Sequence, residues 1–340
     1  MARPLTYEQI FLIYNIAHIS IISTPLASYS AYKRGIFVLE DSTELRQFIK
    51  EIYANFVVKS IAKKSGQRVV YFGSFQELKG SQPGNAHLWG EVVLKISEAT
   101  SRASVSYIQK EVEILKMLQD SHYPRLYFSE VITTDPSTEE PLSPIRFVSI
   151  EEKLVATPLS DKIYLYNSEK KVIDFLIKIV SALKGLWNHP KKLVHRDLKP
   201  DNILIKENDD IYIIDLGILR EEGSAGVTNS LCSFGPCTPY YASPEQAIND
   251  KRNITFKSDL FSLGVIAYEM LSKHNPFHFS DESNYPDEVL ERVCTHIPPP
   301  LDNLGVSEEL SNIIFKMMNK EPYKRYRTPE KILNELEKLR

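Results

Sequence analysis

The run from His195 to Asn202 constrains the fold and chemistry of this chain more than any other stretch. It reads His-Arg-Asp-Leu-Lys-Pro-Asp-Asn, and two short apolar segments follow it, Ile203 to Ile205 and Ile211 to Ile214, with a polar turn between them. Apolar runs of this length around a polar turn predict a β-hairpin. A hairpin returns the chain to its starting edge, so the residues just before and just after it are expected to lie side by side.

The side chains at that edge suit a magnesium ion. Asn202 stands just before the first predicted strand and Asp215 just after the second, and neighbouring strands lie about 5 Å apart. Magnesium takes few protein oxygens and completes its octahedron with water and phosphate oxygens. Asp197 precedes Asn202 closely enough to share the same small volume. A chance cluster of turn-forming Asp and Asn residues is the alternative, but the order, the spacing and the hairpin together favour a functional site.

On these residues the sequence resembles the eukaryotic-type serine/threonine protein kinases, because His195 to Asn202 and Asp215-Leu216-Gly217 match two motifs of that family. The resemblance implies a bilobal α+β fold with a strand-rich N-lobe and a helical C-lobe, and ATP and Mg²⁺ as cofactors. It implies that Asp197 accepts the proton of a substrate hydroxyl, while Asn202 and Asp215 hold magnesium on the ATP phosphates. Lys199 corresponds to a second cation at the transferred phosphate.

A second expected pair joins a strand to a helix. Lys95 lies in the apolar strand from Glu91 to Ile96, where burial of an unpaired ammonium would be costly. In a helix predicted over about Ser104 to Gln119, Glu111 falls on the apolar face. We therefore expect Lys95 and Glu111 to form an ion pair, and the resemblance implies that Lys95 contacts the ATP phosphates. The alternative is a lysine that reaches solvent and a glutamate at the edge of a tilted helix.

The glycine-rich loop of the family is the weakest match. The best alignment places Gly73 at the family's second glycine, with Tyr71 and Gln76 where further glycines usually stand. Glycine lets a backbone approach phosphates closely, so the loss of two glycines is expected to affect ATP affinity and lid closure. The resemblance also implies that Ile150 lines the back of the adenine pocket, and that Glu151 to Lys153 link the two lobes.

Further residues match the family's substrate-binding loop, at Cys237 to Glu245. Thr238 together with Lys199 is the combination associated with serine/threonine rather than tyrosine specificity. The resemblance implies that Arg325 pairs with Glu245 to anchor this loop. That pair is structural rather than catalytic.

Two expectations concern the surroundings of the catalytic residues. Asp259 begins a helix that is apolar on nearly every face, so it can cap this helix, and in the family it also holds the backbone of the catalytic loop. Arg196 beside Asp197 suggests control by phosphorylation, because a phosphate on the activation segment would pair with it. The alternative is that Arg196 hydrogen-bonds to nearby carbonyls and that the activation segment is active without phosphorylation. The candidate phosphosites are Thr228, Ser230 and Ser233.

The chain is expected to divide into a helical extension at residues 1–66, an N-lobe at 67–152 and a C-lobe at 153–340. In the extension, apolar residues at helical spacing predict a helix that starts near Ser42 and stops at Gly66; they are Leu45, Ile49, Ile52 and Phe56. Its role is open between a packing brace on the N-lobe, a dimer contact and a docking surface for a partner. The strands expected in the N-lobe are Arg68 to Phe75, Leu88 to Ile96, Leu126 to Thr133 and Ile145 to Ile150.

Composition limits the classes of function. A net charge of -3 gives no general attraction to nucleic acid, so nucleic acid is not expected as the main partner. The three cysteines are too few for a disulfide framework, which favours the reducing cytoplasm. No apolar run reaches the roughly 20 residues that a membrane helix needs, so membrane insertion is not expected. The oligomeric state is not predicted.

Together these features predict a cytoplasmic serine/threonine protein kinase that transfers the ATP γ-phosphoryl group to hydroxyls of protein substrates, with autophosphorylation. A pseudokinase that acts as a nucleotide-dependent scaffold is the main alternative, because the glycine-rich loop is poor. The presence of the lysine, the glutamate, the base and both magnesium ligands argues against it. A small-molecule phosphotransferase is disfavoured because such enzymes lack the pairing of Lys199 with Thr238.

Overall fold

The computed structural model describes residues 39–62, 68–99, 112–118, 122–215, 220–221 and 237–340. The described residues up to Val155 belong to one compact unit, and those from Ala156 to Arg340 belong to another. Several predicted positions lie outside the described residues, namely Glu111, Leu216, Gly217, Thr228, Ser230 and Ser233.

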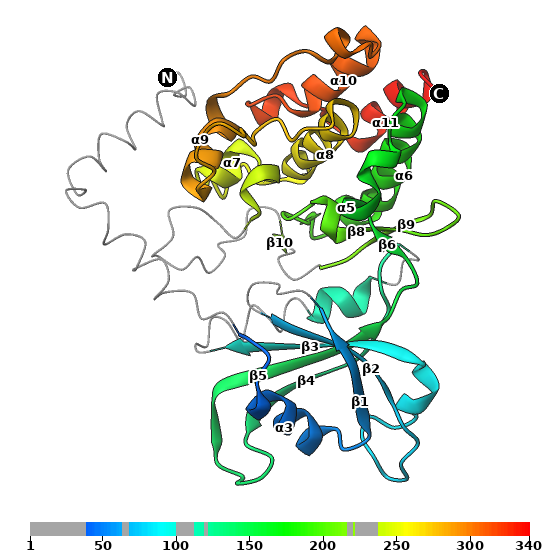
Figure 1. Ribbon diagram of the computed structural model, residues 1–340, viewed down its shortest axis with the longest axis vertical. Helices are drawn as coiled ribbons and strands as arrows, with labels where there is room; N and C mark the ends of the chain where they lie inside the picture. The colour runs from blue at the N-terminus through cyan, green and yellow to red at the C-terminus, as the bar shows by residue number, and fades with distance from the viewer. Residues whose placement is uncertain (1–38, 63–67, 100–111, 119–121, 216–219, 222–236) are drawn as a thin grey trace, which may run out of the picture. The chain divides into compact units, whose positions relative to one another are not determined.

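The smaller unit is built on a five-stranded antiparallel sheet with the strand order β1-β2-β3-β5-β4 (Figure 1). The alternation of buried and partly exposed side chains along β2 and much of β3 shows that one face is packed against a core. A short 3-10 helix, η1 (Ala86–Trp89), precedes β3. The strands are β1 (Phe56–Ile61), β2 (Arg68–Phe75), β3 (Glu91–Ala99), β4 (Leu126–Thr134) and β5 (Pro141–Glu152).

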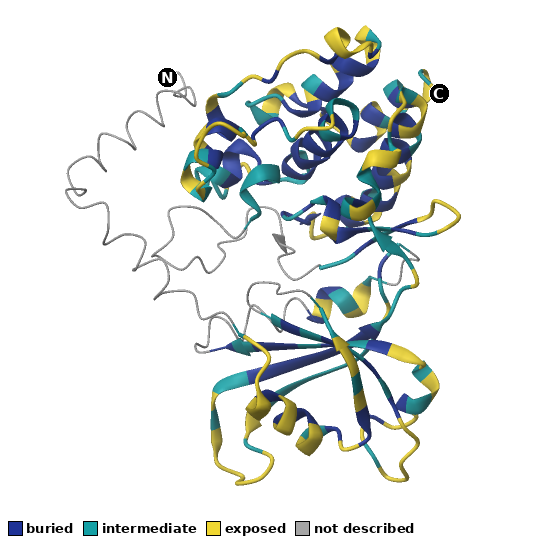
Figure 2. Ribbon diagram, viewed as in Figure 1, coloured by how far each residue is buried: buried dark blue, intermediate teal, exposed yellow. Residues whose placement is uncertain are grey.

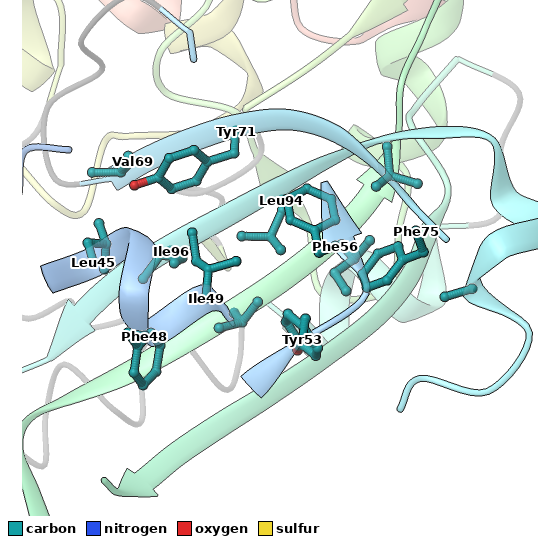
Figure 3. Packing of buried hydrophobic residues seen from close by; sticks show 14 residues of the cluster. Leu45, Phe48, Ile49, Tyr53, Phe56, Val69, Tyr71, Phe75, Leu94 and Ile96 are labelled. Atoms are coloured by element: carbon teal, nitrogen blue, oxygen red, sulfur yellow. The ribbon is translucent and has the colours of Figure 1, made fainter. Parts of the chain in front are cut away.

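Helix α3 (Thr43–Ile52) packs on one face of this sheet (Figure 3). Its N-cap is Ser42, whose hydroxyl accepts a hydrogen bond from the Leu45 amide at 3.0 Å. The buried side of α3 meets the inward-facing residues of the strands, among them Tyr71 and Leu94. Helix α3 therefore packs against the sheet as a brace would, and this packing supports the first of the three roles left open for the N-terminal extension.

The helix predicted as far as Gly66 is wrong beyond Ile52, because a strand begins at Phe56. Phe56 continues the helical spacing of apolar residues, but Val57 and Val58, which follow it, are β-branched and favour strands. The chain changes structure at Asn55, whose side-chain amide donates to the Gln76 carbonyl at 2.8 Å. Since β1 and β2 pair in one sheet, the proposed boundary between residues 66 and 67 falls between two neighbouring strands.

The larger unit is mainly helical and surrounds helix α8 (Phe256–Ser272), which is buried along most of its length (Figure 2). This confirms the prediction of a helix that is apolar on nearly every face. Two small sheets, β6-β8-β9 and β10-β7, complete the unit. The other helices are α5 (Leu159–Lys162), α6 (Glu169–Trp187), α7 (Pro244–Ala247), α9 (Pro286–Thr295), α10 (Glu308–Met317) and α11 (Pro329–Glu337). The small strands are β6 (Thr157–Pro158), β7 (Leu193–Val194), β8 (Ile203–Ile205), β9 (Ile211–Ile213) and β10 (Arg220–Glu221).

Within the described part of the chain, none of the helices combines the length and the apolar character needed to cross a bilayer.

Candidate active site

The predicted hairpin after Asn202 is confirmed. Strands β8 and β9 pair antiparallel, with Ile203 opposite Ile213. The Ile214 amide donates to the Asn202 carbonyl at 3.0 Å, so the backbone bonding continues to the last residue before Asp215. Asn202 and Asp215 therefore flank the same end of the hairpin, as their positions in the sequence predicted.

Three side chains that the sequence predicted as site residues meet around the carboxylate of Asp197. Its Oδ1 accepts from the Thr238 amide at 3.0 Å and from the Thr238 hydroxyl at 2.7 Å. Its Oδ2 accepts from Lys199 Nζ at 2.8 Å and from Asn202 Nδ2 at 3.2 Å. Lys199 also donates to Thr238 Oγ1 at 2.9 Å. The carboxylate is thus oriented by donors on both oxygens, with a cation directly beside it.

Asn202 and Asp215 offer a donor set that fits magnesium. Asn202 Nδ2 donates to the Asp197 carbonyl at 2.8 Å as well as to its carboxylate, which leaves Oδ1 as the amide atom suited to a cation. An amide oxygen and a carboxylate are hard oxygen ligands of the kind that magnesium takes in small number. Among the described residues, no three His, Cys, Asp or Glu side chains are grouped as a metal site.

Asp259 lies in the first turn of α8. It fixes the backbone of the catalytic segment, the name used here for His195 to Asn202. Its buried carboxylate accepts from the amides of His195 and Arg196 at 2.9 and 2.8 Å, and from Trp187 Nε1 at 2.8 Å. Burial raises the pKa of Asp259, and these donors partly oppose the rise. The predicted role of Asp259 in holding this backbone is confirmed, but its predicted role as the helix cap is wrong, because α8 begins at Phe256 and Thr255 is its N-cap.

His195 connects the catalytic segment to the hairpin. Its Nδ1 accepts from the Asp197 amide at 3.3 Å, so Nε2 carries the proton in the neutral ring. Nε2 then donates to the Ile214 carbonyl at 3.2 Å. This bond ties the segment that carries the base to the residue immediately before Asp215.

The loop that follows Thr238 is anchored by a buried ion pair, as predicted. Glu245 and Arg325 have fully buried side chains and are joined by two hydrogen bonds, of 2.7 and 2.9 Å. Gln246 Nε2 donates to the Arg196 carbonyl at 2.6 Å, which connects the loop to the catalytic segment. Burial raises the pKa of the Cys237 thiol to about 12, which disfavours its thiolate form at neutral pH.

Lys95 lies in the smaller unit and pairs with Glu151. The sequence analysis placed Glu151 in the linker between the lobes, but it belongs to strand β5. Its Nζ donates to Glu151 Oε2 at 2.7 Å, and both side chains are largely buried. Ser149 Oγ donates to Glu151 Oε1 at 3.1 Å. An acidic residue directly after the apolar run Phe147 to Ile150 was the available signal, because a carboxylate in a buried strand needs a partner.

The placement of Gly73 at the second glycine of a glycine-rich loop is wrong. Gly73 lies inside β2, opposite Val58 on β1 and Val92 on β3. A Cβ atom at this position would lie 2.4 Å from the Val57 carbonyl oxygen and 2.5 Å from the Phe56 ring. The absence of a side chain therefore makes room for neighbours within the sheet. The chain passes from β1 to β2 through residues 62–67.

The placement of Ile150 at the adenine pocket is also wrong. Ile150 is fully buried in the core cluster under α3 and lies opposite Leu94. Because successive side chains of a strand point to opposite faces, Lys95 projects from the other face of the sheet. Ser149 and Glu151 of β5 lie on the same face as Lys95.

A family model described as the protein kinase domain matches residues 86–336. This chain belongs to the protein kinase family. The match confirms the resemblance stated from the sequence and the bilobal class of fold. It begins within η1, so α3, β1 and β2 of this kinase precede the matched range.

Proteins similar to this kinase carry the names of serine/threonine kinases. PknB of Mycobacterium tuberculosis is 30% identical over 56% of this chain, and a protein of Clostridium perfringens, named as a probable serine/threonine-protein kinase, is 29% identical over 61%. A Dictyostelium discoideum protein, named as the probable kinase nek2, is 28% identical over 75% of this chain. The aligned parts cover 30%, 29% and 57% of these three relatives, respectively.

Proposed function

We propose that this kinase transfers the γ-phosphoryl group of ATP to serine or threonine hydroxyls of protein substrates, its own chain included. The observation that carries the proposal is the arrangement around Asp197. A carboxylate held by the Thr238 amide and hydroxyl, with Lys199 Nζ at 2.8 Å, places a proton acceptor next to a cation. Phosphoryl transfer depends mainly on positioning and charge stabilisation, and both are present in this arrangement.

In this proposal each side chain has a separate task. Asp197 orients the substrate hydroxyl and accepts its proton as the oxygen attacks phosphorus. Lys199 stabilises the negative charge on the transferred phosphoryl oxygens, because its ammonium is held between Asp197 and Thr238. Its position beside the base needs no rearrangement at the moment of transfer.

ATP and Mg²⁺ are the cofactors that this assignment implies. Bound magnesium neutralises the charge of the phosphates, and Asn202 Oδ1 and the Asp215 carboxylate would hold it. Lys95 would contact the ATP phosphates. The support for these roles is the oxygen donor set at the end of the hairpin and the use of ATP and Mg²⁺ by the family to which the chain belongs.

Specificity for serine and threonine is supported by two observations. Lys199 donates to the Thr238 hydroxyl at 2.9 Å, and this combination matches the serine/threonine branch of the family. The similar proteins from Mycobacterium tuberculosis and Clostridium perfringens carry serine/threonine kinase names. The cytoplasm is the proposed compartment, on the basis of the low cysteine content.

Control by phosphorylation is proposed through Arg196. Its backbone is fixed by Asp259 and Gln246, so a phosphate that paired with its guanidinium would be connected to the catalytic segment. The candidate acceptors are Thr228, Ser230 and Ser233. Mass spectrometry of the active protein is the check, and full activity with all three hydroxyls unmodified would contradict this route.

The test of the proposed function is transfer of labelled γ-phosphate to a generic basic substrate protein and to the chain itself, with magnesium present. Asp197→Asn is expected to lower the transfer rate by about 100-fold or more, because general base catalysis contributes that much. The matched control is Asp209→Asn, since Asp209 is exposed in the hairpin turn. Wild-type protein that binds ATP without transferring label would support the scaffold alternative, and an active Asp197→Asn variant would contradict the assignment of the base.

A further inference from the structure

Strand register places Lys95 and Glu151 on one face of the small sheet. On the paired strands β3 and β5, Lys95 lies opposite Ser149 and Val93 lies opposite Glu151. Residues two apart on a strand share a face, so Lys95 and Glu151 are diagonal neighbours across two strands. Long side chains reach each other over such a diagonal. The pair is therefore formed within the sheet, between strands that are hydrogen-bonded to each other.

The pair is largely removed from solvent and its geometry is fixed. The side chains of Lys95 and Glu151 are 14% and 7% exposed, and Nζ lies 2.7 Å from Oε2. The other carboxylate oxygen, Oε1, accepts from Ser149 Oγ at 3.1 Å. Removing one partner of a buried ion pair leaves an uncompensated charge. Glu151 therefore both fixes the Lys95 ammonium and balances its charge.

We propose that Glu151 is a positioning residue that holds the Lys95 ammonium for the ATP phosphates. This inference rests on the proposed function, because it assigns Lys95 to the nucleotide. An ammonium has three N–H donors, so the bond to Glu151 is compatible with further bonds to phosphate oxygens. This counter-charge comes from β5, a strand of the same sheet as Lys95.

Three substitutions separate charge from packing at this pair. Glu151→Gln removes the charge with little change of shape, and Glu151→Asp keeps the charge on a shorter side chain. Ser149→Ala removes the hydroxyl that fixes the carboxylate and leaves both charges in place. The matched control is Glu152→Gln, because Glu152 is the next residue on β5 and lies opposite Val92, on the other face of the sheet.

The experiment measures kcat and KM for ATP in the full chain, together with the Kd for ATP in the Asp197→Asn background. Glu151→Gln is expected to raise KM and Kd about tenfold, because it removes a charged hydrogen bond from Lys95, with a smaller change in kcat. Glu151→Asp should retain most of the affinity, Ser149→Ala should raise KM moderately, and Glu152→Gln should match wild type. A purely structural defect would instead lower the folded fraction without changing the KM of the protein that remains active.

The inference is overturned if folded Glu151→Gln keeps the wild-type KM and Kd, or if Glu151→Asp is as impaired as Glu151→Gln. Should Glu151→Gln not fold, the other two variants decide, and wild-type KM in both overturns it. The Kd needs no phosphate transfer. An inactive wild type whose ATP affinity falls with Glu151→Gln would refute the proposed function and leave this inference standing.

Discussion

The buried guanidinium of Arg325 uses five N–H···O bonds, which equals its full number of donors. Two go to Glu245, at 2.7 and 2.9 Å. The other three go to the carbonyls of Asn319, Lys257 and Lys320, at 2.7, 2.9 and 3.3 Å. The Arg325 side chain thus joins Glu245, at the end of the loop that follows Thr238, to α8 and to the segment after α10.

Replacing Arg325 with methionine leaves the Glu245 carboxylate fully buried without its counter-charge. Breaking a buried pair in this way costs about 3–5 kcal/mol, a large part of the roughly 5–15 kcal/mol that stabilises a typical protein. The neighbouring Lys324 has a side chain that is 52% exposed. Lys324→Met should therefore change the free energy of unfolding by no more than about 0.5 kcal/mol.

Urea denaturation followed by circular dichroism measures both variants beside wild type. A loss below about 1 kcal/mol for Arg325→Met, the value of a surface pair, would refute the argument from burial. A double-mutant cycle with Glu245→Gln gives the coupling directly. The double variant should lose less stability than the sum of the two single losses, because neither charge is then left buried alone, and simple additivity would contradict the pair.

Two further predictions concern a lysine and a glycine. Burial lowers the pKa of Lys320 to about 7, so between pH 7 and pH 10 the unfolded chain holds a proton that the folded protein releases, and wild type should gain stability with rising pH. Relative to Lys320→Met, the gain should be on the order of a few kcal/mol, and a difference that stays constant from pH 6.5 to pH 10 would contradict it. Gly73→Ala should cost about 1–3 kcal/mol by overpacking, because its Cβ would meet the Phe56 ring at 2.5 Å. Thermal unfolding measures this loss, whereas an unchanged Tm with an altered KM for ATP would favour a phosphate-binding role for Gly73.

The catalytic segment was predictable because its determinants are local. Asn202 and Asp215 are joined by a hairpin whose two apolar strands and polar turn are visible in the sequence, and Asp197 is close to Asn202 along the chain. The family resemblance supplied the distant contacts. The pairing of Arg325 with Glu245 spans 80 positions and has no local signal.

The incorrect predictions concern residues whose secondary structure, sheet face or partner is not determined by the local sequence pattern. The run Phe147 to Ile150 is apolar at three of its four positions. Its pattern therefore does not show which side chains face the core, and Ile150 was assigned to the wrong face of the sheet. Phe56 fits the helical spacing of the residues before it, but sheet pairing with Phe75 decides its conformation. Glu151 was missed as the partner of Lys95 because the register that brings them together depends on two strands far apart in sequence.

The hydrogen bonds that Asp259 accepts from the His195 and Arg196 amides also affect local unfolding of the larger unit. These amides lie outside any helix, yet their acceptor belongs to the first turn of the buried helix α8. Local opening of a loop normally requires little free energy. Here the catalytic segment cannot detach without breaking bonds to the central helix, so the two behave as one cooperative unit. Partly unfolded forms that retain α8 while exposing the catalytic segment should therefore be rare.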